Sequence, residues 1–378
     1  MKRTLFLFFA VIIVMSVPVK ASAPEGFDLN NQLDALGAGE LVEQLPQQAM
    51  DMLREAEMDE ISPESLLSLS PGRFFSMLWQ IIVQNVRQPL VVLGTVMGII
   101  VLTSLLEGMK NTAGENSLSP VFGAVSILAV LTSLAFPIMN AIIDTASAVR
   151  QASMFMLSFI PMFSATLVAS GRPVTGATYN LFLFGTCQIV AQVVAQTLVP
   201  LMGIFLALCI VGALVPELNI ASTAGAIKSI VSWALGLSCT VFVGLLSVQT
   251  MVAGSSDSLT ARTAKFLIGS FVPVVGSALG DAYMAAQGSL RLIKTTVGAY
   301  GIIVAAMIFL PILIQTFAWF MLTNVAAIGS DILGVTRISG VLRACGSVLG
   351  ILLAVIICYA LLIIVSTTVI LITGMGGL

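Results

Sequence analysis

The chain has 378 residues, of which 58% are hydrophobic and 9% charged, with a net charge of −2 and no histidine. A soluble globular domain has about 25% charged residues, so this composition excludes an ordinary water-exposed fold. It also argues against a basic nucleic-acid surface, and the missing histidine removes the commonest general base and metal ligand. Uncharged stretches such as 173–216 and 295–330 exceed the about 20 residues that a helix needs to cross a bilayer. We therefore expect an all-α, polytopic helical membrane protein.

Residues 1–23 have the pattern of a secretory signal peptide. A basic start at Lys2 and Arg3 precedes an apolar run, and the small residues 21–23 form a cleavage site. An uncleaved anchor is the alternative, although the apolar run is short for a full crossing. In both cases we expect residues 24–70 to lie outside the cytoplasm.

The acidic extracytoplasmic segment 24–70 holds 11 of the 18 acidic residues and one base, Arg54. Its mixture of leucine and valine with glycine and proline predicts one or two short amphipathic helices rather than a packed domain, because so few residues bury little surface.

Residues 71–88 predict an interfacial amphipathic helix, since aromatic residues flanked by arginines suit the membrane–water boundary. Packing onto another protein subunit is the alternative, and the same apolar face would serve it. The candidate docking surface consists of Phe74, Phe75, Leu78, Trp79 and Ile82.

The remaining chain, 89–378, is expected to be a multi-pass membrane domain. The stretch 173–216 predicts either one tilted crossing or two short ones that turn at Pro200. Charged residues between the stretches, such as Asp144 and Asp257, are expected in loops. The expected crossings are 89–106, 121–143, 151–170, 179–213, 226–252, 264–286, 296–323 and 344–372, each long enough to span.

A short motif occurs twice, at an offset of 112 residues, which predicts an internal duplication with copies at about 145–253 and 257–370. Each copy has an arginine followed by Ser-Phe-x-Pro. Proline frees a backbone carbonyl, so the two segments suggest broken helices that line a polar path; kinked, tightly packed helices without a transport role are the alternative. The candidate pathway residues are Ser158, Pro161, Ser270, Pro273 and Asp281, and their candidate charged partners are Arg150, Arg262 and Lys265.

Asp281 marks either a functional charge at membrane depth or a helix end at the interface. The five cysteines form no CxxC pair and predict small buried apolar residues. No catalytic constellation, metal motif or GxxxxGK[ST] phosphate loop is present in the sequence. We expect no enzymatic activity and no cofactor.

The stretches 246–249 (LSVQ), 261–266 (ARTAKF) and 271–276 (FVPVVG) resemble the stage III sporulation protein AE family, and 324–327 (NVAA) is similar as well. The resemblance covers essentially 70–378. It implies a protein of the mother-cell membrane around the forespore in an endospore-forming bacterium. Such a protein is one component of a secretion-like channel complex, and its partners are other membrane proteins of the stage III complex, including a separate ATPase. The family has no catalytic residues to transfer.

Two functions remain open from the sequence. The first is a non-enzymatic component of the sporulation channel complex that links mother cell and forespore, embedded in the lipid bilayer and docked to partners through its N-terminal segments. The second is a self-contained secondary transporter with a mid-membrane site formed by the two Ser-Phe-x-Pro segments. Loss of 24–60 should impair the first, whereas changes at Ser158, Ser270 or Asp281 should impair the second.

Overall fold

The computed structural model describes the backbone of residues 38–43, 45–56, 71–113, 119–214, 220–271 and 276–373, with a few positions between 58 and 65. Several helix ends within these ranges are described by their backbone alone, among them 109–113, 252–271 and 276–287. The predicted signal peptide and its cleavage site lie outside the described residues.

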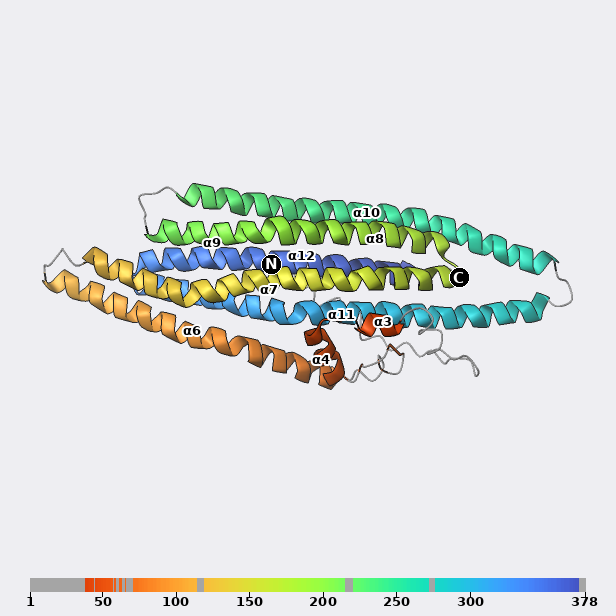
Figure 1. Cartoon of the computed structure of the whole chain (residues 1–378), viewed down its shortest axis with the longest axis horizontal. Helices are drawn as coiled ribbons and strands as arrows, with labels where there is room; N and C mark the ends of the chain where they lie inside the picture. Colours follow the sequence, from red (N-terminus) through yellow and green to blue (C-terminus); the bar gives the residue numbers. More distant parts are fainter. Residues whose placement is uncertain are drawn as a thin grey trace.

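All regular structure in the described ranges is helical, and six long segments lie side by side, reversing direction at each connection (Figure 1). Two short helices, α3 (Ala38–Glu43) and α4 (Gln47–Glu55), precede them. The long segments are α6 (Pro71–Ala113), α7 (Ser119–Ala169), α8 (Pro173–Val193) continued by η1 (Val194–Leu198) and α9 (Val199–Leu214), α10 (Ile220–Phe271), α11 (Gly276–Ile332) and α12 (Thr336–Thr373).

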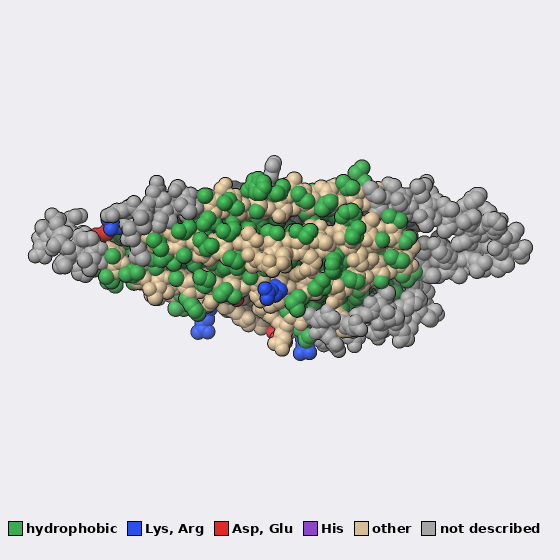
Figure 2. All heavy atoms as spheres, turned by 45° about the horizontal axis from the view of Figure 1, so that its top comes forward, with side chains coloured by type: hydrophobic (Ala, Val, Ile, Leu, Met, Phe, Trp, Pro, Cys, Tyr) green, Lys and Arg blue, Asp and Glu red, His purple; other side chains and the backbone are tan. Residues whose placement is uncertain are grey.

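Each long segment is apolar enough to cross a membrane. Within the described residues six candidate spans are present, of 27 to 47 residues each. At 1.5 Å per residue even the shortest is about 40 Å long, more than the about 30 Å of a hydrocarbon core. The face of the bundle in Figure 2 carries many hydrophobic side chains and few charged ones. Among the exposed hydrophobic side chains, Leu181 is 72% and Trp233 69% exposed. The prediction of an all-α fold is confirmed for the described residues, and six of its helical segments are long and apolar enough to span a membrane, as a polytopic protein requires.

The centre of the bundle is formed by α11 and α12. The apolar windows of these helices are 67% and 61% buried, whereas those of α6 and α10 are 22% and 17% buried. The largest fully buried side chains include Trp319 on α11 and Tyr359 on α12. The peripheral helices therefore present most of their surface outward, to lipid or to other proteins.

Two glycines on α11 let it approach α7 closely. Phe155, Phe159 and Phe163 of α7 stack on consecutive turns, with ring centroids 5.4 and 5.5 Å apart. A Cβ on Gly301 would lie 2.1 Å from the Phe159 ring, and one on Gly298 would lie 3.1 Å from the Phe163 ring. Small residues permit such close contacts between membrane helices, which are packed by van der Waals interactions.

The α7–α8 and α11–α12 connections are tight turns of the same kind. Gly171 and Gly334 both have φ of 79°, the left-handed conformation that ends a helix and favours glycine. In the first turn the Arg172 N–H donates to the Leu167 carbonyl at 3.0 Å, and the second turn contains the equivalent bond. Each turn reverses the chain so that consecutive helices pack antiparallel.

The expected separation between 121–143 and 151–170 is wrong, because both stretches belong to the continuous helix α7. Asp144 and Arg150, which were expected to mark the loop between them, lie inside this helix with exposed side chains. A charged residue does not end a helix when its side chain can leave the packed face. Charge alone was therefore a poor marker of helix boundaries.

Helix α6 runs without interruption through Pro89, so the boundary expected at residue 88 lies inside one helix. The stretch 173–216 forms a single segment rather than two crossings, and Pro200 does not turn the chain. The π-helical segment η1 ends two residues before this proline. Such a π turn absorbs an irregularity in the hydrogen-bond ladder without ending the helix.

The expected crossing at 264–286 falls across the end of one helix and the start of the next. Helix α10 ends at Phe271 and α11 begins at Gly276. Asp257, expected in a loop, lies within α10. The long α10 and α11 run antiparallel on either side of this connection (Figure 1).

Candidate functional site

The first Ser-Phe-x-Pro copy lies in the middle of α7. The helix continues through Pro161, whose side chain is exposed, while Ser158 is partly buried. Arg150, two turns earlier, is also exposed. The helix is therefore not broken at this copy, which removes the geometry that the pathway hypothesis required there.

The second copy has a different place in the fold. Ser270 is next to the last residue of α10, and Pro273 lies outside the described residues. Asp281 belongs to the second turn of α11, but its side chain, like those of Arg262 and Lys265 on α10, is not described. One copy is thus inside a helix and the other begins at a helix end, so the two segments do not form the matched pair of broken helices that the pathway hypothesis required.

The start of α6 has two distinct faces. Met77 and Ile81 are buried, 7% exposed each, and pack toward the bundle. The opposite face carries Phe75 and Trp79, both 68% exposed, followed one turn later by Ile82. The spacing of 75, 79 and 82 puts these three side chains on one side of the helix. We call them the outer α6 face.

The two remaining residues of the predicted docking surface are turned more toward the protein. Phe74 and Leu78 are partly buried. Phe74 lines a pocket of about 370 Å³ with Met77 and with Glu55 at the end of α4. Three of the five predicted residues are therefore exposed enough to meet a partner directly.

Helix α4 shows that part of the acidic segment packs against the bundle. Its Ala49, Met52 and Leu53 are buried, whereas Asp51 and Arg54 on the other side are exposed. This is the amphipathic pattern expected from the sequence. The helix lies beside the start of α6 (Figure 1), so the docked part of the segment and the outer α6 face belong to one region of the surface.

The interior contains polar groups that the sequence interpretation did not single out. Lys294 of α11 is 2% exposed, and its Nζ donates to the Leu371 carbonyl at 3.4 Å. The Tyr359 hydroxyl donates to the Cys187 carbonyl at 3.3 Å. These bonds link helices and satisfy buried polar groups, a structural role. The sequence did offer one signal for the burial of Lys294, because this residue lies directly before the uncharged stretch 295–330.

Within the described residues, no three cysteine or acidic side chains gather as a metal site would require.

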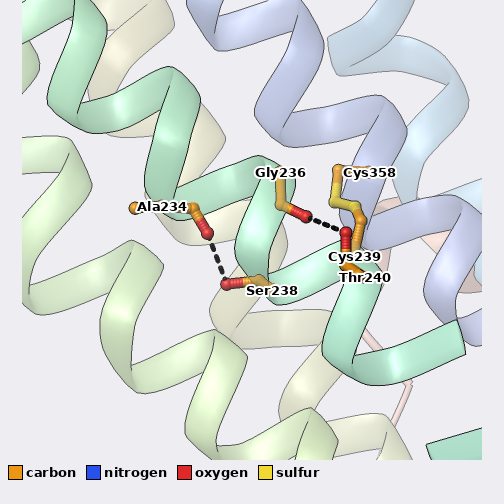
Figure 3. Close-up of a disulfide and its surroundings, with 6 residues drawn as sticks. All are labelled: Ala234, Gly236, Ser238, Cys239, Thr240 and Cys358. Atoms are coloured by element: carbon orange, nitrogen blue, oxygen red, sulfur yellow. Dashed lines mark hydrogen bonds between the residues drawn. A yellow bond between two sulfur atoms is a disulfide. The ribbon is translucent and has the colours of Figure 1, made fainter. Parts of the chain in front are cut away.

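Two cysteines far apart in sequence meet between peripheral and central helices. Cys239 of α10 and Cys358 of α12 form a disulfide with Cα atoms 7.0 Å apart (Figure 3). Both side chains are partly buried, as is the free Cys209, so the expectation of five small buried residues is wrong for these three and holds for Cys187 and Cys345, which are free and buried. No sequence signal joins the pair, because the two positions are 119 residues apart.

Comparison with known proteins matches this chain to one family. The family model described as stage III sporulation protein AE matches residues 55–374. A protein of that name from Bacillus subtilis (strain 168) is 30% identical over 239 residues, which cover 62% of this chain and 59% of the relative. The chain thus spans under two thirds of that relative's length. No solved structure matches.

Proposed function

Because the chain belongs to the stage III sporulation protein AE family, we propose that it is a multi-pass component of the sporulation channel complex linking mother cell and forespore. It is embedded in the mother-cell membrane that surrounds the forespore. It acts without catalysis or a cofactor, and a separate ATPase of the complex provides energy. Its own task is to hold partner proteins on a membrane-embedded helical bundle.

The outer α6 face is the observation that supports this proposal best. Phe75 and Trp79 are large apolar side chains with two thirds of their surface exposed. Further along α6 the polar residues Gln84, Arg87 and Gln88 are exposed and separate this face from the apolar stretch 90–106. That stretch alone covers about 25 Å, close to the thickness of a hydrocarbon core. The outer α6 face therefore lies beyond the stretch that fills the hydrocarbon core, where a protein partner can reach it.

The alternation of the helices extends the proposal to topology. The six candidate spans reverse direction at each connection (Figure 1). If each crosses the membrane once, the start of α6 and the end of α12 lie on the same side of it. With a secretory signal at 1–23, that side is the extracytoplasmic one. The acidic segment, the outer α6 face and the α10–α11 connection then all face the space between the two membranes, where partners dock.

The test compares two exposed tryptophans in the sporulating host. Trp79→Ala removes a ring from the outer α6 face, and Trp233→Ala removes an equally exposed ring (69%) from α10. An interfacial aromatic contributes about 2 kcal/mol or more when it is a binding hot spot, enough to weaken a complex more than tenfold. We expect Trp79→Ala to lower the yield of heat-resistant spores, with membrane levels unchanged. Equal spore yields in the two variants would contradict the proposal.

The self-contained transporter has less support. It needs two broken helices around one cavity, but α7 is continuous at Pro161 and the second motif lies at the end of α10. No other observation favours it. We therefore retain the complex component as the proposed function.

A further inference from the structure

A groove with basic residues at one end opens between α10, α11 and α12. Its volume is about 540 Å³, within the range of ligand-binding pockets. Its polar lining lies near the turn between α11 and α12, because Asn324 is eight residues before the end of α11 and Arg343 seven residues after the start of α12. Its polar lining is formed by Lys228 and Ser232 of α10, Asn324 of α11, and Arg343 and Ser347 of α12.

Two glycines on consecutive turns of α12 shape the groove. A Cβ on Gly346 would lie 3.2 Å from Thr323 Oγ1, and one on Gly350 would lie 3.3 Å from the Phe320 ring. Larger residues at these positions would press against α11 and reduce the space between the helices. The width of the groove therefore depends on the absence of side chains at these two positions of α12.

The two cations that line the groove retain binding capacity. Arg343 donates to Asp331 and, through Nε, to the Ser339 hydroxyl at 3.3 Å. A guanidinium has five N–H donors, so three remain for another ligand. Lys228 is exposed and, in the described part of the chain, has no acidic partner. Asp331, the ion-pair partner of Arg343, does not line the groove, and none of the lining residues is acidic, so the polar end of the groove suits an anion.

The other end of the groove is apolar. Leu235 lies about 10 Å beyond Lys228 along α10, and Ala354 lies about 16 Å beyond Arg343 along α12, where Ile351 also lines the groove. A free phosphate would use only the polar end. A phospholipid uses both, with its head group at the cations and an acyl chain along the apolar walls. We infer that this groove binds one anionic phospholipid, and the inference does not depend on the proposed function.

The test uses the purified full-length protein, stripped of lipid in detergent and supplied with phosphatidylglycerol, phosphatidylcholine or inorganic phosphate. Retained lipid is counted by native mass spectrometry. One cation near an anionic lipid changes binding about fivefold. We expect Lys228→Gln to lose about fivefold in phosphatidylglycerol retention and Lys228→Arg to keep it. Arg337→Gln, which removes an exposed charge from α12 outside the groove lining, is the matched control.

A second variant tests the apolar end. Ala354→Phe fills the groove without changing its charge, and we expect it to lower phosphatidylglycerol retention as well. Circular dichroism and size-exclusion profiles check that the variants fold. Equal retention of the two lipids, equal loss in Lys228→Gln and Arg337→Gln, or competition by millimolar inorganic phosphate would each overturn the inference.

Discussion

The close contact between α7 and α11 makes the stability of the bundle sensitive to one glycine. In Gly301→Ala the added Cβ would lie 2.1–2.9 Å from three carbons of the Phe159 ring, whereas optimal carbon contacts are about 3.5–4.0 Å. Overpacking of this kind costs about 1–3 kcal/mol. The same change gains up to about 1 kcal/mol from helix propensity. Gly185→Ala on α8 gains the same helix propensity without overpacking, since nothing lies within 4 Å of the added Cβ.

The measurement is the free energy of unfolding in mixed detergent–SDS micelles, followed by circular dichroism. We expect Gly301→Ala to be less stable than Gly185→Ala by about 1–3 kcal/mol. In a Phe159→Ala background the clash is gone, so Gly301→Ala should become neutral or stabilising, a non-additive result. If Gly301→Ala matches the Gly185 control, or if its effect is unchanged without the Phe159 ring, the described α7–α11 packing is incorrect.

Three further predictions concern the turns, the interior and the cysteines. Gly334→Ala should lower the free energy of unfolding by about 1–2 kcal/mol because alanine is disfavoured at positive φ, whereas Gly340→Ala, in open space on α12, should not; equal effects would refute the turn. Lys294→Met should leave stability unchanged or raised in the same assay, since an apolar side chain of similar volume replaces a buried cation; a large loss would indicate a strong ionic partner. Peptide mapping of oxidised protein should recover Cys239 linked to Cys358, and recovery of another pair would contradict the α10–α12 contact.

The class of fold followed from composition, because an apolar chain with few charges must use lipid as its solvent and only helices or closed barrels span lipid. The ends of the individual helices did not follow from composition. Asp144 was expected in a loop and Pro161 in a broken or kinked helix, yet α7 is continuous through both. Both side chains are exposed, so neither the charge nor the proline ring lies in the packed face. A local sequence pattern indicates which conformation a residue favours by itself, whereas the point at which a helix ends also depends on the helices that pack against it.

The candidate residues were predicted with uneven success for the same reason. The exposed face at 75, 79 and 82 follows from helical spacing alone, which a sequence shows directly. The Lys228–Arg343 groove and the Cys239–Cys358 pair join helices more than 100 residues apart, and no local pattern encodes such a meeting. The motif repeated at Ser158 and Ser270 was the most visible signal, yet its copies occupy unlike places in the fold.

The central claim is that the outer α6 face binds another protein of the sporulation complex, and site-specific photocrosslinking in sporulating cells tests it directly. A photoreactive amino acid is placed at Trp79 or, as the control, at the equally exposed Trp233. The account predicts a discrete crosslink from position 79 to a stage III membrane protein, present only during sporulation and absent from position 233. Crosslinks from position 79 to lipid alone, or the same protein adducts from both positions, would contradict it.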